Sequence, residues 1–588
     1  MIYKKLSLVL SLIFATTFLS SCGNFSENEN INKTTLEFDF DEKAVQTSYD
    51  ENQVISAGNP FFFTITINKN YSLNYVKGNG KDLSRKAGGS YILTLVEGKN
   101  IIEISTSMYQ SFSVENVDRN PRDCYETMWI NRGYPHFPSI GNQKLLVIPV
   151  KIKGYEYLAT EENINAINTA FFANSQDIDF ESVASYYYKS SYGRLNISGQ
   201  VSDWFDCNLT AEEISSNAND KSYGTYGILD SAIEWIKTTQ ANIDLKDYDN
   251  NRDGFIDGVY LVYGAPTFLD NSKLNSNTFW NFTFYNINNK DKNNTDSPIG
   301  MTYSWSSIEN IFKGYNTDLV DAHVFIHEFG HQLGLTDYYD TSGQDGTPYT
   351  SPMGGLDMMD NNIGDHSSFS KFALGWVEPK KIVGTVGSVD VTIHNTDANG
   401  DFLILGGSSF NDSPFNEYFI IEYLSVEKNN YNLNYYDSQN GYKVAMYSDG
   451  RIVKFYEKSG IRITHIDARA IDSDGNYSYD LNNYTSTKFT NTPSTKKGYY
   501  CEANNNSFVL TSLISRVQTR NTLGTFFVAN SSDLFVEGDE INFYQGDSNS
   551  RAKMLPYEKN YFDSGEKFDY KIKILSVDSN QSTIRIYN

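Results

Sequence analysis

Two histidines and a glutamate stand close together in the segment His327-Glu328-Phe-Gly-His331. On a helix, residues four apart lie one turn apart on the same face, so both imidazoles can bind one metal ion. Glu328 is rotated by about 100° from His327 and would lie beside that ion, where its carboxylate can take a proton from water. The chain has only 7 histidines, so this spacing is not expected by chance. The segment therefore predicts a zinc site with Glu328 as the general base.

Zinc needs a third protein ligand, and Asp337 is the best candidate. Gly334 can adopt a backbone conformation that a side chain would block, so the chain can leave the helix there and return Asp337 to the ion. A glutamate from a downstream helix would be unusually distant, because the next glutamate in the chain is Glu378. Asp365 and His366 remain as alternative ligands.

The rest of the predicted helix has supporting functions. His323 lies one turn before His327 but about 12 Å along a regular helix from His331, so it cannot share their ion. We expect a structural or supporting role for His323. The opposite helix face would seat against the core through its apolar side chains, which are Ala322, Phe325, Phe329 and Leu333.

A second candidate metal site lies in the acidic segment 249–257. Oxygen donors alternate with other residues there, and glycine occupies the sixth place, as in an EF-hand loop. The twelfth place is Tyr260 instead of glutamate, so the segment is not a complete EF-hand. It predicts a calcium site, with an acidic turn without metal as the alternative. The expected calcium ligands are Asp249, Asn251, Asp253, Asp257 and the carbonyl of Phe255.

The elements that position these residues alternate between strands and helices from about residue 116 to 380. Apolar runs predict buried strands at 144–152 and 259–263. Apolar residues at helical spacing predict helices at 164–171 and 229–236. This alternation predicts an α/β catalytic domain over residues 116–380.

Both flanks of that domain predict β structure. Short alternating strands over residues 36–115 predict a small β-sandwich that serves as a spacer or a propeptide. Residues 381–588 predict one or two β domains, with strands at 417–423, 461–466 and 584–587. The expected fold class is α+β.

The N-terminus has the features of a lipoprotein export signal. Two lysines precede an apolar run over residues 6–18, which is short for a membrane span. Small residues then precede Cys22, as in the bacterial lipobox, whose cysteine receives a lipid. We expect a signal peptide over 1–21 and a polar tether over 22–35, with an ordinary cleaved signal peptide as the alternative. The mature protein would be held at the extracellular face of the cell membrane, or released after processing.

Composition limits the partners. The formal net charge of −24 disfavours nucleic acid, because no basic surplus exists to replace the phosphate counterions. After Cys22 the chain has only Cys124, Cys207 and Cys501. The sequence allows one disulfide, between Cys124 and Cys207, without deciding whether it forms. Three cysteines do not make a disulfide framework.

The segment from His327 to Asp337 resembles the extended zinc motif of the metzincins, with aspartate in the third ligand position. Further segments are similar to those of the immune inhibitor A family of bacterial metallopeptidases and follow the family's order. They are residues 182–199, 357–360, 374–376, 417–422 and 460–467. The resemblance covers roughly residues 120–588.

This resemblance implies a metzincin-like catalytic domain that acts on proteins or peptides. It also implies that Met359 is the methionine of the turn beneath the zinc, with Met358 as the alternative. Some metzincins carry a tyrosine two residues after this methionine, whereas this chain has Asn361. The group that stabilises the oxyanion therefore stays open, and Tyr338 and Tyr339 are its nearest candidates in the sequence.

Together these features predict a secreted, surface-anchored, zinc-dependent endopeptidase that works as a monomer. Two alternatives remain open. One is a cell-surface binding protein, an adhesin, whose zinc site is vestigial. The other is a zinc hydrolase of a non-protein amide, since neither the fold nor the metal site names a substrate.

Overall fold

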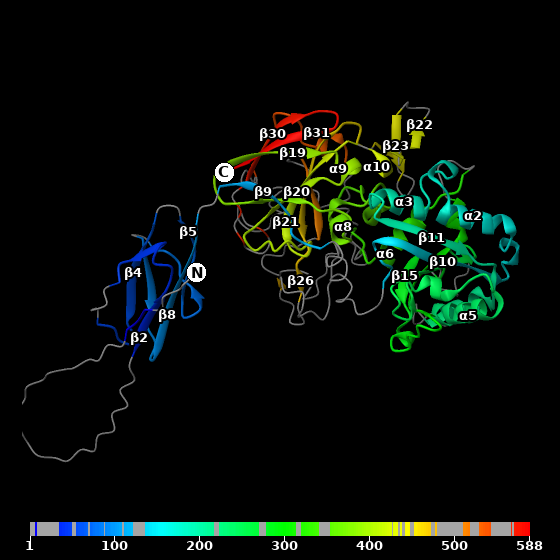
Figure 1. Cartoon of the computed structure of the whole chain (residues 1–588), viewed down its shortest axis with the longest axis horizontal. Coiled ribbons are helices and arrows are strands. Elements are labelled where there is room, and N and C mark those ends of the chain that lie inside the picture. Colours follow the sequence, from blue (N-terminus) through cyan, green and yellow to red (C-terminus); the bar gives the residue numbers. More distant parts are fainter. Residues whose placement is uncertain are drawn as a thin grey trace, which may run out of the picture. The chain divides into compact units, whose positions relative to one another are not determined.

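A computed structural model describes most of the chain. The described residues are 6–8, 34–49, 54–68, 71–86, 89–108, 111–120, 136–216, 223–269, 278–312, 319–339, 353–425, 427–432, 435–437, 442–446, 452–454, 456–471, 477–478, 510–517, 529–542, 562, 566, 568 and 570–588. They divide into two compact units, each described here by itself (Figure 1). The first comprises Met1–Phe112 with Gly384–Gly387, and the second comprises Ser113–Val383 with Ser388–Asn588.

The first unit contains two sheets, in the strand orders β1-β2-β8-β5-β6 and β3-β4-β7. The strands are β1 (Leu6–Leu8), β2 (Thr35–Asp39), β3 (Val45–Thr47), β4 (Pro60–Ile67), β5 (Tyr71–Gly78), β6 (Lys81–Asp82), β7 (Ser90–Thr94) and β8 (Lys99–Met108). Alternate residues of β4, such as Phe61 and Phe63, are buried, as expected where one face of a sheet meets a core. Buried side chains from both sheets form one apolar cluster.

The second unit is built around a mixed sheet with the order β11-β10-β14-β17-β15, in which β12 also pairs with β10. Its strands are β10 (Gly141–Lys153), β11 (Leu195–Val201), β12 (Phe205–Thr210), β14 (Val259–Gly264), β15 (Phe282–Tyr285) and β17 (Thr302–Ser307). The strands from β11 to β17 are parallel, and only β15 runs antiparallel, at the edge. β14 is apolar and buried throughout because side chains cover both faces of the sheet.

Helices lie on both faces of this sheet. α2 (Glu161–Phe172), α3 (Val183–Ser190) and α6 (His323–Gln332) contribute to the core on one face. α4 (Ala211–Ser216) and α5 (Tyr223–Thr239) contribute to a separate core on the other face. The strands and helices expected from the apolar runs at 144–152, 259–263, 164–171 and 229–236 are therefore confirmed.

The C-terminal half of this unit is rich in strands. A six-stranded sheet has the order β28-β25-β21-β20-β18-β9, and a four-stranded sheet has the order β19-β31-β30-β29. Their strands are β9 (Ser113–Asn116), β18 (Lys380–Val383), β19 (Ser388–His394), β20 (Phe402–Gly406), β21 (Glu417–Leu424), β25 (Gly460–Asp467), β28 (Thr511–Ile514), β29 (Glu540–Asn542), β30 (Lys571–Val577) and β31 (Gln581–Tyr587).

Smaller elements complete the second unit. The short strands are β13 (Phe255–Ile256), β16 (Ile299–Gly300), β22 (Tyr435–Asp437), β23 (Tyr442–Met446), β24 (Ile452–Lys454), β26 (Ala470–Ile471) and β27 (Tyr477–Ser478). The short helices are α7 (Met358–Asn361), α8 (Ser368–Ala373), α9 (Thr396–Asn399) and α10 (Lys428–Asn432).

The overall class is α+β, as predicted. Strand β9 differs from expectation: the sequence places residues 113–115 in the N-terminal sandwich, but β9 pairs with β18 in the C-terminal sheet. This pairing joins residues far apart in the sequence, so no local pattern reveals it. Among the described residues, every helix is too short or too polar to cross a membrane.

Candidate metal centre

Helix α6 holds the predicted zinc-binding motif and is almost wholly buried. It ends at Gln332, and Gly334, two residues further on, takes a φ of +95° that favours glycine. There the N–H of Gly334 donates to the carbonyl of His331 (2.9 Å) and the N–H of Leu335 donates to that of Gly330 (3.0 Å). These two bonds form a Schellman ending, which turns the chain back toward the histidines as the glycine predicts.

The reversal places Asp337 between the two imidazoles of the helix. Its Oδ1 lies 3.1 Å from Nε2 of His327 and 3.4 Å from Nε2 of His331. Ligand atoms of a tetrahedral zinc ion, each at about 2.0–2.1 Å, lie about 3.3 Å apart. The two separations therefore fit the edges of such a tetrahedron, and the donor set of two nitrogens and one oxygen suits zinc.

Backbone carbonyls fix the orientation of both histidines. Nδ1 of His327 lies 2.7 Å from the carbonyl oxygen of Met358, and Nδ1 of His331 lies 2.8 Å from that of Leu335. A carbonyl only accepts, so each Nδ1 carries the proton and each Nε2 is left free to bind a metal. Sequence reasoning missed these carbonyls because a backbone acceptor leaves no trace in the residue type.

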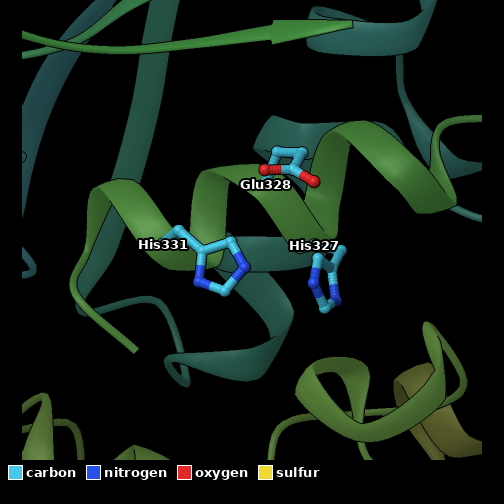
Figure 2. A group of neighbouring side chains, drawn as sticks. All are labelled: His327, Glu328 and His331. Carbon is cyan, nitrogen blue, oxygen red and sulfur yellow. The ribbon is translucent and has the colours of Figure 1, made fainter. Parts of the chain in front are cut away.

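Glu328 lies beside the histidines on the same helix, and ligand atoms of the three side chains lie within 4.8 Å of one another (Figure 2). Its side chain is only 6% exposed. The hydroxyl of Thr283, on the edge strand β15, lies 3.1 Å from Oε2 of Glu328. Burial raises the pKa of Glu328 above its ordinary value, against the lowering effect of the nearby histidines. Thr283 was not predicted from the sequence.

Charges at the centre are strongly coupled. Burial disfavours the charged form of His331, but the Asp337 carboxylate outweighs it and raises the pKa of His331 to about 9. Burial also opposes ionisation of Asp337, yet the histidines hold its pKa well below the ordinary value. The carboxylate thus stays ionised and favours a positive charge beside it, which is the charge that a metal ion supplies.

Two methionines lie beneath the helix in α7. Met358 supplies the carbonyl that contacts His327, and both methionine side chains are fully buried. The sulfur of Met359 lies so close to Gly330 of α6 that a Cβ there would approach it to 2.6 Å. The structure therefore places Met359 directly against the metal-binding helix, where the predicted methionine of the turn would lie.

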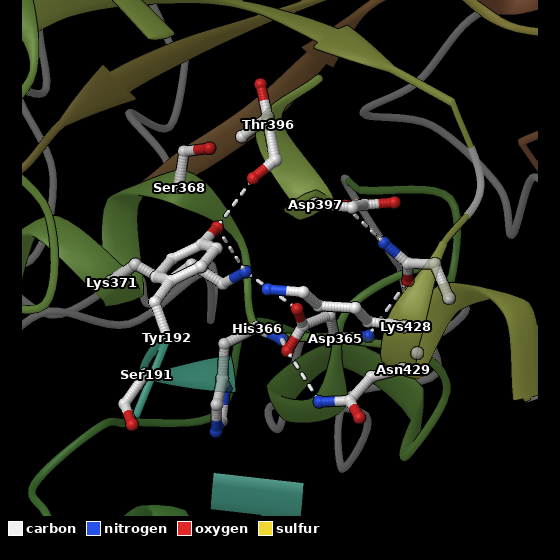
Figure 3. Close-up of polar contacts among 12 residues, drawn as sticks. Ser191, Tyr192, Asp365, His366, Ser368, Lys371, Thr396, Asp397, Lys428 and Asn429 are labelled. Atoms are coloured by element: carbon white, nitrogen blue, oxygen red, sulfur yellow. Dashed lines mark hydrogen bonds and ion pairs between the residues drawn. The ribbon is translucent and has the colours of Figure 1, made fainter. Parts of the chain in front are cut away.

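The alternative ligands lie elsewhere, in a buried polar cluster (Figure 3). Asp365 pairs through Oδ2 with Nζ of Lys371 at 2.6 Å, and its Oδ1 accepts from Asn429 at 3.1 Å. Nε2 of His366 lies 3.2 Å from the hydroxyl of Tyr187. Asp365 is committed to these contacts, whereas Nδ1 of His366 has no hydrogen-bond partner among the described residues. The approach of Asp337 to both imidazoles, at 3.1 and 3.4 Å, makes it the better candidate for the third ligand.

The two tyrosines considered for the oxyanion differ in position. The hydroxyl of Tyr338 is buried and lies 2.6 Å from Oγ of Ser370 in α8. Burial, with the neighbouring carboxylates of Asp337 and Glu328, raises the pKa of Tyr339 well above its ordinary value. Of the two, Tyr339 is therefore the one near the centre.

His323, at the start of α6, is not part of the centre. Its Nδ1 lies 2.7 Å from Oδ1 of Asp321, and its ring stacks on Phe180 with centroids 4.3 Å apart. These contacts agree with the structural role expected for His323.

The acidic loop 249–257 folds around its own side chains. Oδ1 and Oδ2 of Asp249 accept from the N–H groups of Asp253 (2.9 Å) and Gly254 (3.0 Å). Oδ1 of Asn251 also accepts from Asp253 (2.8 Å), and Phe255 begins strand β13. The predicted ligands therefore converge on one loop closed by Gly254, whose φ is +89°.

Asp257 stands out in this loop. It is 1% exposed, and its Oδ1 has no hydrogen-bond partner among the described residues. Burial, with smaller contributions from Asp253 and Asp249, raises its pKa to about 8. A buried carboxylate oxygen without a donor, close to two more carboxylates, fits a divalent cation.

Three cysteines lie outside the described residues, namely Cys22, Cys124 and Cys501. Cys207 is a free thiol whose sulfur lies 3.2 Å from the carbonyl oxygen of Lys151. The structure therefore gives no support to the disulfide considered between Cys124 and Cys207.

A search of curated proteins gives no match to this chain. A comparison with protein families matches residues 166–377 to the immune inhibitor A peptidase M6 catalytic domain. The matched range contains the whole centre, from Thr283 through α6 to α7. This match identifies residues 166–377 as a catalytic domain of the immune inhibitor A type, and it supports a metallopeptidase.

Proposed function

We propose that the protein is a zinc-dependent endopeptidase in which His327, His331 and Asp337 hold the metal and Glu328 is the general base. The observation that carries this proposal is the approach of one Asp337 oxygen to both Nε2 atoms, at 3.1 and 3.4 Å. When bound, the ion would act as a Lewis acid toward water and toward the scissile carbonyl.

The protein residues orient the metal ligands and transfer the proton. Met358 and Leu335 hold the imidazoles through their carbonyls, so that both Nε2 atoms keep their orientation. Glu328, beside the ligands and shielded from solvent, takes the proton from the attacking water and delivers it to the leaving amine. Burial raises the pKa of Glu328, which favours the protonated form that delivers the proton to the leaving amine.

Cleavage within a chain is supported by the position of β15. This strand is the antiparallel edge of the sheet, and it contacts the general base through Thr283. An extended peptide can add to a sheet edge by main-chain hydrogen bonds, with residues continuing on both sides of the scissile bond. The mixed sheet, the helix behind it and the buried methionine support a metzincin-like arrangement.

The test uses Glu328→Gln, which keeps the size of the side chain but cannot accept the proton. We expect unchanged zinc content and loss of at least about 10²-fold in cleavage of an unfolded protein, the lower bound for a general base. The surface variant Glu378→Gln, whose carboxylate pairs with Arg194, is the control and should cleave normally. Full activity of Glu328→Gln, or chelator-resistant cleavage by the wild type, would overturn the proposal.

We also propose that the loop 249–257 binds calcium through Asp249, Asn251, Asp253, Asp257 and the Phe255 carbonyl. The partnerless Oδ1 of Asp257 supports it. Calcium should raise the melting temperature of the wild type, and Asp257→Asn should abolish that rise while zinc content stays unchanged. A calcium response that survives in Asp257→Asn would contradict the assignment.

We further propose that lipid on Cys22 holds the enzyme at the outer face of the cell membrane. The support is the charged and apolar N-terminus followed by the Leu-Ser-Ser-Cys sequence. Cys22→Ala should move the protein from the membrane fraction to the soluble fraction. An unchanged distribution would contradict lipid anchoring.

A further inference from the structure

A chain of hydrogen bonds leads from the central sheet to the carboxylate of Glu328. At the end of α6, the buried Gln332 side chain donates through Nε2 to the carbonyl of Val259 (3.0 Å) and to Oγ of Ser304 (2.8 Å). Ser304 and Thr283 are cross-strand partners on β17 and β15, and their hydroxyl oxygens lie 2.6 Å apart. Oγ1 of Thr283 lies 3.1 Å from Oε2 of Glu328 and 2.8 Å from its carbonyl oxygen.

The number of available hydrogens fixes which group donates at each step of this series of hydrogen bonds. Both hydrogens of the Gln332 amide are used, so Ser304 accepts from Gln332 and must pass its own hydrogen onward. The shortest path is the 2.6 Å contact with Thr283, compared with 3.3 Å to the carbonyl of Glu328. Thr283 then accepts from Ser304, and its single hydrogen is left for Glu328. The carbonyl of Glu328 is nearer to Thr283, at 2.8 Å against 3.1 Å for Oε2, but an ionised carboxylate is the stronger acceptor. This hydrogen is therefore directed to Oε2 when Glu328 is charged.

We propose that Thr283 is a positioning residue for Glu328, an inference that rests on the proposed function. Its hydroxyl, oriented by Ser304 and Gln332, holds Oε2 and leaves the other oxygen, Oε1, to receive the proton of the attacking water. A base fixed in this way needs no reordering during the reaction, whereas a free glutamate would sample several rotamers. Because Thr283 lies on the edge strand, the same strand that we propose aligns the substrate also aligns the base.

The experiment compares two variants of the full-length, zinc-loaded protein. Thr283→Val keeps the branched shape suited to a strand but removes the hydroxyl, and Thr283→Ser keeps the hydroxyl. We expect Thr283→Val to lower kcat about 10- to 100-fold, part of the roughly 10²–10⁴-fold that a general base contributes, with KM changed less than about twofold. Thr283→Ser should restore kcat to within about threefold of wild type, because it retains the donor.

A matched control is Thr392→Val. Thr392 also lies on a strand and meets a cross-strand hydroxyl, that of Thr583 at 3.3 Å, but in the four-stranded C-terminal sheet. This variant should keep the kcat of the wild type. Zinc content and melting temperature are measured for every variant, so that a folding defect is recognised.

Three results would overturn the positioning role. They are an unchanged kcat in Thr283→Val, a loss expressed mainly in KM, and a failure of Thr283→Ser to restore kcat while zinc content and melting temperature are normal. Each leaves the proposed function intact, provided that the wild type cleaves protein in a chelator-sensitive manner. Absence of that wild-type cleavage would instead defeat the proposed function.

Discussion

Asp337 contributes a single oxygen that serves both histidines, and its negative charge is central to that role. Asp337→Asn keeps the shape but loses the charge. We expect zinc affinity to fall by more than the roughly 10–100-fold that loss of a supporting hydrogen bond costs. Competition with a chromophoric chelator measures this affinity.

The control for this variant is Asp321→Asn, which also removes a carboxylate paired with a histidine of α6, namely His323. Asp321 lies at the other end of the helix, so zinc affinity should stay within about threefold of wild type, well below the effect of losing a supporting group. Equal losses in the two variants would show that Asp337 acts through folding and not as a ligand.

His366 makes the protein sensitive to acid. Burial lowers the pKa of His366 from 6.5 to about 3. Below pH 6.5, His366 therefore binds a proton in the unfolded chain but not in the folded chain. The contribution of His366 to the free energy of unfolding should therefore fall, by up to about 1.4 kcal/mol per pH unit, as the pH drops from 6.5 toward 3. Burial raises the pKa of Asp357 and Asp397 to about 6, and these groups act in the opposite direction between about pH 4 and 6.

The variant His366→Phe isolates this contribution. A phenyl ring fits the aromatic neighbours of His366, and the hydroxyl of Tyr187 keeps its bond to the carbonyl of Ile326 (2.7 Å). Denaturant unfolding between pH 7.5 and 5 should show that the free energy of unfolding of the variant, relative to that of the wild type, increases as the pH falls. Parallel curves for variant and wild type would show that His366 does not titrate as described.

How far the centre could be predicted depended on distance along the chain. His327, Glu328, His331 and Asp337 lie within eleven residues, where helix geometry and one glycine decide the arrangement. Thr283 reaches Glu328 from 45 residues away, through a strand register that no local pattern specifies.

At the scale of elements, α6 and α7 pack so closely that a Cβ at position 330 would force the Met359 side chain to shift. A Cβ there would lie 2.6 Å from the sulfur of Met359 and 3.2 Å from the hydroxyl of Tyr187. Gly330→Ala should lower the free energy of unfolding by about 1–3 kcal/mol, the usual effect of overpacking. Denaturant unfolding of the zinc-free protein measures it without the contribution of the metal.

Gly227 in α5 is the matched control, because it is also helical but its Cβ would meet nothing within 4 Å. Gly227→Ala should leave stability unchanged or raise it by about 0.5–1 kcal/mol, since alanine favours helix. A Gly330→Ala variant as stable as Gly227→Ala would show that the two elements can separate at no cost.

Strands could be predicted from the sequence where their residues are apolar, and could not where their residues are mostly polar. Residues 417–423, 461–466 and 584–587 alternate or run apolar, and they form β21, β25 and β31 as predicted. β17 has the sequence TYSWSS, and its serines point into hydrogen-bond networks instead of an apolar core. Only Tyr303 and Trp305 give this strand an apolar pattern, so its hydrophobic signature is weak, although it carries Ser304.

At the scale of the whole molecule, the two compact units have separate cores. Phe63 is 1% exposed and lies in the core of the first unit, with the rings of Phe38 and Tyr91 beside it. Phe63→Ala should destabilise that unit by about 3–5 kcal/mol. Calorimetry should show one of two transitions moving to lower temperature and the other unchanged.

Proteolytic rates of Phe63→Ala should match the wild type, because every residue of the metal centre belongs to the second unit. A single transition that shifts as a whole would show instead that the units unfold together.

The pairing of β9 with β18 also limits how much of the N-terminal segment could be removed without disturbing the C-terminal sheet. Lys380 lies opposite Asn116, and Val383 lies opposite Ser113, so the strand belongs to the C-terminal sheet along its whole length. Removal of residues up to 112 would leave that sheet whole. A cut beyond Asn116 would instead remove the edge strand β9 from the C-terminal sheet. The backbone N–H and C=O groups of β18 would then be exposed to water and to other chains.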